Sequence, residues 1–138
     1  QAIDYSLSIT PSNANSSPRS TDIKRIFFYH SAAYNVFKSM YEQGMFDQRT
    51  IYGIGHLDSL YDKTTNDYII NLASTNAVKV VAVHKDSVSI SETDSRTPSQ
   101  MHTDLMAAGA LSIITQVDHS VIPVEYCSSV ISEILQQT

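Results

Sequence analysis

The fold is decided by the stretch Ile23-Lys24-Arg25-Ile26-Phe27-Phe28-Tyr29-His30. This mostly apolar run follows a polar segment and continues directly into a helical pattern at 32–46. A short apolar run bounded in this way predicts a buried β-strand over 23–30. Its last residue is polar and precedes a helix, an arrangement found at the carboxyl edge of open α/β sheets, where ligands bind.

The periodicity of apolar residues predicts the elements on either side of this strand. Alternation over 3–9 predicts a first strand, the run 78–83 is the clearest strand of the chain, and a last strand is expected around Pro123. The helices predicted from helical spacing cover 32–46, 66–74, 101–117 and 128–136, and the last strand covers 121–126. The segments 11–21, 47–65 and 87–100 are predicted loops, with one short turn of helix in the second.

Strands that alternate with helices favour a mostly parallel sheet covered by helices. We therefore expect an α/β fold with about five strands. The chain has 138 residues, of which 42% are apolar and 17% are charged. This composition provides one hydrophobic core and too little charge for a disordered chain. The sequence predicts a single domain over 1–138.

Charge and cysteine content limit the partners of this domain. A net charge of −5 and nine scattered basic residues argue against direct binding of nucleic acid. No apolar run approaches the roughly 20 residues that span a membrane, and 1–20 lack the layout of a secretory signal. Cys127 is the only cysteine, so no internal disulfide forms. We expect a soluble cytoplasmic protein without a bound cofactor; a processed secreted form stays open because the sequence starts at Gln1.

Two histidines make up the first candidate site. His30 and His84 end predicted strands that we expect to be neighbours, so their imidazoles are predicted to meet at one rim of the sheet. There they would bind a small anion, relay a proton, or share a metal with Asp86, His56 or His102. The alternative is that both are half-exposed polar residues that merely end strands.

Three further residues are candidates. Tyr34 and Asn35 would line the same rim, unless Tyr34 belongs to the core with Phe37. Cys127 precedes the expected helix start at Ser128, where the helix dipole would favour a thiolate and make Cys127 a catalytic sulfur acceptor. A buried, inert thiol is the alternative. No G-x-S-x-G motif places a serine as nucleophile, so a hydrolase ranks last among the functions considered.

The run Phe27-Phe28-Tyr29-His30-Ser31-Ala32-Ala33-Tyr34-Asn35 resembles the second strand and turn of the DsrE/DsrF-like proteins, which include the TusD-type sulfur-relay subunits. The segments 5–10 and 78–83 resemble the first and third strands of that family, and Gly109-Ala110-Leu111 with Asp118 before 121–124 resembles its closing helix and strand. Catalytic subunits of the family carry a cysteine at or just after the third strand, whereas 80–84 contains none.

The resemblance implies a DsrE-like sulfur-relay or accessory subunit that acts through protein partners and lacks its own persulfide cysteine. It also implies a homo- or hetero-oligomer, with the apolar residues of 130–135 at the interface. The residues alone support a second hypothesis from another class. This is a non-enzymatic α/β domain that holds a small anion or a metal at the strand ends through His30, His84 and Asp86.

Overall fold

The computed structural model describes residues 25–48, 51–75 and 78–136, and this part of the chain forms one parallel sheet. The four strands are β1 (Ile26–His30), β2 (Gly53–Leu57), β3 (Lys79–Lys85) and β4 (Leu111–Thr115). They lie side by side in the order β1-β2-β3-β4. The predicted α/β class is confirmed, with four described strands in place of about five. The strand predicted at 3–9 lies outside the described residues.

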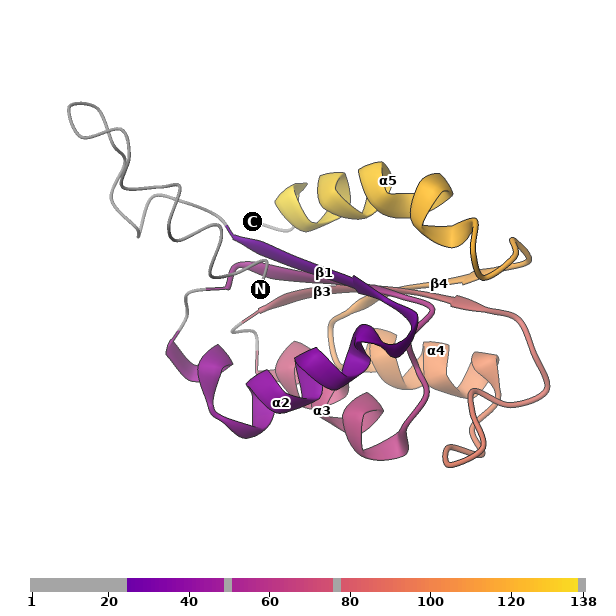
Figure 1. Cartoon of the computed structure of the whole chain (residues 1–138), viewed down its shortest axis with the longest axis horizontal. Coiled ribbons are helices and arrows are strands. Elements are labelled where there is room, and N and C mark those ends of the chain that lie inside the picture. Colours follow the sequence, from indigo (N-terminus) through magenta and orange to yellow (C-terminus); the bar gives the residue numbers. More distant parts are fainter. Residues whose placement is uncertain (1–24, 49–50, 76–77, 137–138) are drawn as a thin grey trace.

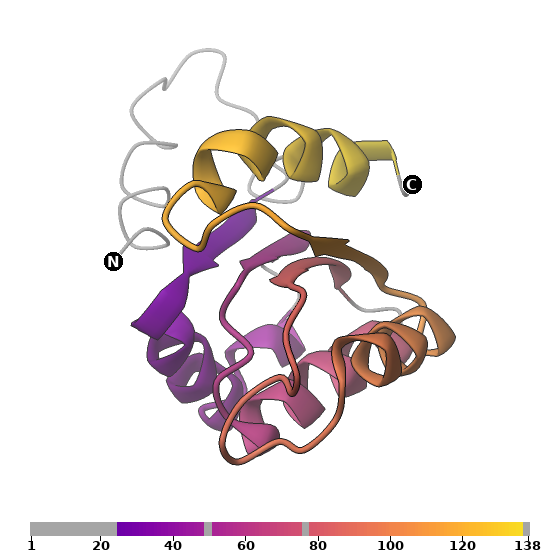
Figure 2. The same cartoon turned by 90° about the vertical axis from the view of Figure 1, so that its right-hand side faces the viewer.

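Helices cover both faces of the sheet. The helical elements are η3 (Ser31–Ala33), α2 (Tyr34–Glu42), η4 (Met45–Gln48), α3 (Lys63–Ser74), α4 (Pro98–Ala107) and α5 (Ile122–Gln136). Figures 1 and 2 show α2, α3 and α4 on one face and α5 alone on the other. We call these the α2–α4 face and the α5 face. None of the helices in the described ranges is long and apolar enough to span a membrane.

Side chains that alternate along each strand build two separate cores. The paired residues Phe27, Ile54 and Val80 belong to the core of the α2–α4 face. Residues one position further along the strands, such as Val81, pack with Val130 of α5 in the second core. Nearly continuous burial of β3 is typical of a central parallel strand and explains why its sequence is so uniformly apolar.

One strand was predicted as loop. β2 lies within 47–65, and all five of its residues are buried. Its sequence, Gly-Ile-Gly-His-Leu, contains two glycines and a histidine in place of the β-branched residues that indicate a strand. The glycines are needed because a Cβ at Gly53 would lie 2.3 Å from Ile134 Cγ2, and one at Gly55 would lie 2.5 Å from Phe28 Cε1.

The expected helix at 101–117 and strand at 121–126 are wrong. α4 begins earlier, at Pro98, because Thr97 and Gln100 form a reciprocal capping box, and it ends at Ala107 before Gly109, whose φ is 99°. The apolar residues that follow form β4. α5 begins at Ile122, so Pro123 occupies the first helical turn, where its missing N–H costs no hydrogen bond.

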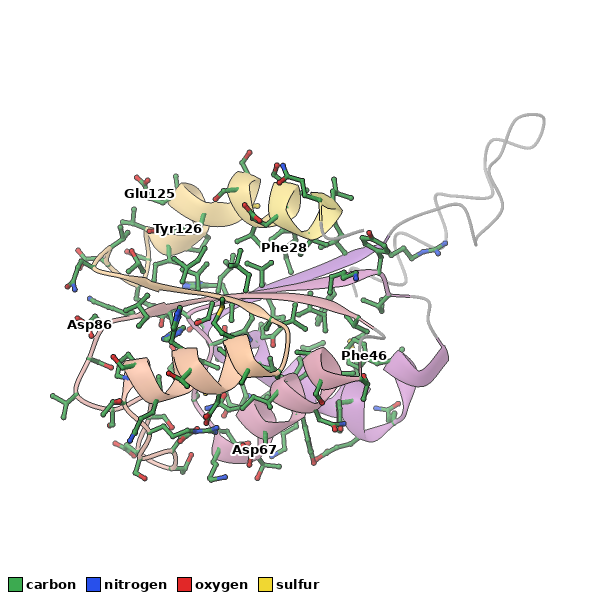
Figure 3. All side chains as sticks on the ribbon, turned by 180° about the vertical axis from the view of Figure 1, so that it is seen from behind. Phe28, Phe46, Asp67, Asp86, Glu125 and Tyr126 are labelled. Atoms are coloured by element: carbon green, nitrogen blue, oxygen red, sulfur yellow. The ribbon has the colours of Figure 1, made fainter. Side chains whose placement is uncertain are left out.

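Gly55→Ala should lower the free energy of unfolding by about 2 kcal/mol, because an added methyl group overpacks the core between β2 and α5. Phe28 lies between the sheet and α5 (Figure 3), and Val130 Cγ1 would be only 2.9 Å from the new Cβ. Urea unfolding of the variant measures the loss. In a Phe28→Ala background the same substitution should cost clearly less, whereas an equal cost in both backgrounds would contradict this account of the glycine.

Candidate functional site

A chain of hydrogen bonds crosses the carboxyl edge of the sheet between β1, β2 and the loop after β4. The Ser31 hydroxyl lies 3.3 Å from the Tyr61 hydroxyl, which lies 3.4 Å from Nε2 of His119. Nδ1 of His119 in turn lies 2.5 Å from Oδ2 of Asp58. We call these four residues the edge chain. They come from three separate segments and meet where open α/β sheets bind their ligands.

Ser31 directly follows β1 and is the first residue of η3, where the chain turns sharply into the helical segment formed by η3 and α2. Its φ of 60° lies in the left-handed region, which serine rarely adopts. The turn permits the chain to change from an extended strand to a helix in one residue, with His30 still extended at φ −140°. Small residues follow, Ala32 and Ala33, so no bulky side chain crowds the serine from the first helical turn.

Asp58 is held in place by the neighbouring strand. It directly follows β2, and its φ of 47° makes it the other non-glycine residue with positive φ in the described ranges. Its backbone N–H donates to the carbonyl of Val83 over 2.7 Å, and its Oδ1 accepts from the N–H of Lys85 over 3.3 Å. These contacts leave Oδ2 directed at His119.

His119 lies in the loop between β4 and α5, and two further contacts fix this loop. Nε2 of His30 donates to the carbonyl oxygen of His119 over 2.9 Å, and the two imidazole rings lie 4.3 Å apart. Next to His119, the carboxylate of Asp118 lies 3.3 Å from Nζ of Lys85 at the end of β3. The His119 side chain is 39% exposed, so one side of the imidazole faces solvent.

The partners of His119 determine which nitrogen carries a proton. A carboxylate only accepts hydrogen bonds, so Nδ1 of His119 is the donor to Asp58. In the neutral imidazole Nε2 is then an acceptor directed at Tyr61. This is the orientation that a general base needs, with the proton-accepting nitrogen on the open side of the ring.

The prediction that His30 and His84 share a cleft is wrong. β1 and β3 are not neighbours, because β2 lies between them. His30 pairs with Leu57, which belongs to the core of the α5 face. His84 lies on the opposite face, where its Nε2 is 3.0 Å from the hydroxyl of Ser112. The two histidines therefore do not form one shared ligand site. A separate ligand-binding role for His30 or for His84 stays a prediction.

His84 belongs to a buried polar group on the α2–α4 face, together with His56 and His102. Burial lowers the pKa of His84 to about 4, with a further lowering by His102 and smaller opposing effects of Asp58 and Asp86. Burial also lowers the pKa of His56 to about 3, assisted by His84. Nδ1 of His56 contacts the Tyr29 hydroxyl, whose pKa is raised by burial. Both histidines are therefore neutral at pH 7.

The remaining rim residues lie on either side of the edge chain. Tyr34 starts α2, and its ring centroid lies 5.5 Å from that of Tyr61. Asn35 is exposed and donates to the carbonyl of Ala32 over 3.2 Å, a local contact that keeps it out of the edge chain. Asp86 lies at the same edge (Figure 3), where it accepts from Nε2 of Gln116 over 2.9 Å. Their predicted ligand-binding roles stay predictions.

Cys127 does not lie at a helix start. It is half-buried in the second turn of α5, beyond the first turn in which the helix dipole would favour a thiolate. The physical argument for its reactivity is therefore wrong, and its role as a sulfur acceptor stays a prediction.

The interface predicted at 130–135 is corrected in part, because Val130 and Ile134 are fully buried against the sheet. Oligomerisation itself stays a prediction.

Comparisons of the chain with protein-family models, curated proteins and solved structures find no match. The resemblance to the DsrE/DsrF-like proteins thus stays a prediction, and the function must be argued from the geometry. In the described part of the chain, no three His, Cys, Asp or Glu side chains are placed to hold a metal ion.

Sequence reasoning missed Ser31, Asp58, Tyr61 and His119. Asp58 and Tyr61 lie in the segment predicted as loop, because β2 went undetected. His119 follows a strand that was predicted as the end of a helix. Ser31 directly follows the strand predicted over 23–30, and the two alanines after it were the available signal of a tight strand-to-helix turn.

Proposed function

We propose that the protein is a hydrolase of small carboxylic esters, with Ser31 as the nucleophile, His119 as the general base and Asp58 as the residue that orients His119. One observation carries the proposal. The two non-glycine residues with positive φ in the described ranges, Ser31 and Asp58, stand at the two ends of a single hydrogen-bonded chain. Such backbone conformations cost about 1–3 kcal/mol each and concentrate at functional sites.

The placement of Ser31 supports a nucleophilic role. A serine on a strained turn between a parallel strand and a helix presents its hydroxyl at the top of the sheet, as in the nucleophile elbow of α/β hydrolases. The chain order of the three groups, serine then aspartate then histidine, is also the order used on that fold. The glycines that usually flank such a serine are replaced here by Tyr29 and Ala33.

Backbone donors lie next to the serine. Ala32 and Ala33 follow Ser31 in η3, at the start of the helical segment, and the first N–H groups of a helix have no acceptor within the helix. The N–H of the residue after a nucleophile commonly stabilises the oxyanion of a tetrahedral intermediate. Ala32 would supply this group.

Ser31→Ala should reduce the hydrolysis of p-nitrophenyl acetate to no more than the rate of an equal concentration of free histidine, because the activated nucleophile is removed. Asp58→Asn should reduce kcat by about 10²- to 10⁴-fold, because His119 loses the carboxylate that fixes its tautomer. Release of p-nitrophenolate measures both effects. Ser39→Ala is the matched control, since Ser39 is an exposed serine of α2 outside the edge chain.

Two outcomes would contradict the proposal. The first is ester hydrolysis by the wild-type protein at no more than the rate of an equal concentration of free histidine. The second is hydrolysis that survives Ser31→Ala and Asp58→Asn unchanged.

A further inference from the structure

The general base does not touch the nucleophile. In the described residues the hydrogen bond of the Ser31 hydroxyl goes to Tyr61, and the tyrosine hydroxyl continues to Nε2 of His119. The serine and the imidazole are thus connected only through the oxygen of Tyr61. A serine that is activated by a histidine normally lies within about 2.6–3.2 Å of it.

The direction of every hydrogen bond in the edge chain follows from the carboxylate and from the neutral imidazole that a general base requires. Because Asp58 accepts from Nδ1 of His119, Nε2 of the neutral ring is the acceptor of the Tyr61 hydroxyl proton. The Tyr61 oxygen has then given its only proton to His119, so it accepts from the Ser31 hydroxyl. All three donors point the same way, from Ser31 toward Asp58.

We propose that Tyr61 is a catalytic residue that carries the proton from Ser31 to His119. The inference rests on the proposed ester hydrolase. When the Ser31 oxygen bonds to the acyl carbon, its proton passes to the Tyr61 oxygen while the proton of Tyr61 passes to Nε2 of His119. Cleavage of the ester C–O bond releases an alcohol, which takes its proton back along the same path. Water then repeats both steps on the acyl-serine and releases the acid.

The surroundings of Tyr61 hold its hydroxyl between the two partners. Its ring centroid lies 5.5 Å from that of Tyr34 and 6.4 Å from that of His119. Its carbonyl oxygen accepts from the hydroxyl of Thr93 over 3.3 Å, which ties it to the loop before α4. The side chain is partly exposed, so removal of the hydroxyl leaves the core unchanged.

Tyr41→Phe provides a matched control. Tyr41 lies in α2, and within the described ranges its hydroxyl accepts from Nδ2 of Asn71 over 2.7 Å and makes no hydrogen bond to the edge chain. Tyr61→Phe removes a hydroxyl from the proton path, whereas Tyr41→Phe removes one from outside it. Both variants keep every aromatic ring in place.

The test is the rate at which p-nitrophenyl acetate acylates the protein in a stopped-flow burst experiment. Tyr61→Phe should slow acylation by about 10²-fold or more, because loss of a positioned proton carrier typically has this effect. Tyr41→Phe should stay within roughly twofold of the wild type, since it leaves every general acid–base contact intact. Thermal unfolding of both variants should match that of the wild type.

A second readout is the solvent isotope effect on acylation. In mixtures of H₂O and D₂O, a relay moves two protons in the transition state, so the acylation rate of the wild type should depend non-linearly on the deuterium fraction, and the residual rate of Tyr61→Phe should depend on it linearly. Acylation of Tyr61→Phe at the wild-type rate or faster would overturn the relay and leave the hydrolase proposal standing. Absence of any wild-type acylation would overturn both.

Discussion

Arg96→Ala should lower the free energy of unfolding by about 3 kcal/mol, because it leaves the carboxylate of Asp94 buried without a cation. The Asp94 side chain is 1% exposed, and its oxygens accept from Nε and Nη2 of Arg96, the shortest contact being 2.6 Å. The other terminal nitrogen of Arg96 reaches Asp104 of α4 over 3.1 Å, and Nη2 also reaches Asp67 of α3 over 3.0 Å. Arg96 thus joins the loop before α4 to two helices.

The contacts of Asp94 with Arg96 and Asn66 also change the pKa of the Asp94 carboxyl group. Hydrogen bonds from Arg96 and Asn66 lower the pKa of Asp94 to about 2 despite the opposing effect of burial. Because the folded-state pKa lies below the unfolded value, this contribution is complete above about pH 4 and is lost as the pH falls toward 2. Urea unfolding at pH 7 therefore measures the full loss.

Lys63→Ala is the control for this prediction. Lys63 lies 2.7 Å from Asp67 on the surface of α3, with both side chains about half exposed, so its removal should cost less than about 1 kcal/mol. The double variant Asp94→Asn/Arg96→Met removes both charges and should be more stable than Arg96→Ala alone. A loss below 1 kcal/mol for Arg96→Ala would show that the pair is not held as the structure describes.

The second large effect is a loss of stability in mild acid. His56 and His84 have pKa values lowered by burial to about 3 and about 4, against about 6.5 in the unfolded chain. The unfolded state therefore binds more protons, and the stability contributed by these groups is complete above pH 6.5 and is lost as the pH falls toward 4. Each histidine contributes on the order of 1.4 kcal/mol per pH unit in this window.

The measurement is the free energy of unfolding in urea between pH 6.5 and 4.5, a range above the titration of most carboxylates. His84→Gln and His56→Gln should each reduce the slope of stability against pH by about half, whatever they do to stability at pH 7. A wild-type slope near zero in this range would contradict the burial of both neutral imidazoles.

The elements that were predicted correctly from the sequence are those whose apolar pattern follows directly from which of their faces are buried. β3 was detected because a strand buried on both faces needs a continuous apolar run, and Val80 to Val83 provides it. α2 was detected because one face packs on the sheet through Phe37 and Met40 while the other is polar. In both cases local pattern and tertiary environment agree.

The missed elements depend on partners distant in sequence. The glycines of β2 make sense only when α5 is placed against them, through contacts with Ile134 and Val130 some 80 residues later. β4 was joined to α4 because Gly109 was assigned to a helix interior, whereas its φ of 99° marks the turn that separates the two elements. Neither close packing nor positive φ is visible in the residues alone.

The candidate site was located in part. The carboxyl end of β1 was correctly expected to be a rim, and His30 does contact the residue proposed as general base. The partner of His30 was misassigned, because alternation places His84 on the opposite face of the sheet. The edge chain requires the register of β1 against β2 and the course of the loop after β4, which only the structure provides.

The central claim is that Ser31 is an activated nucleophile at this edge. Its most direct test is treatment of the wild-type protein with a fluorophosphonate, followed by intact mass and peptide mapping. The account predicts one phosphonyl adduct for each chain, on Ser31, which disappears when His119 is replaced by alanine. An unmodified protein, or an adduct on another serine that persists without His119, would contradict it.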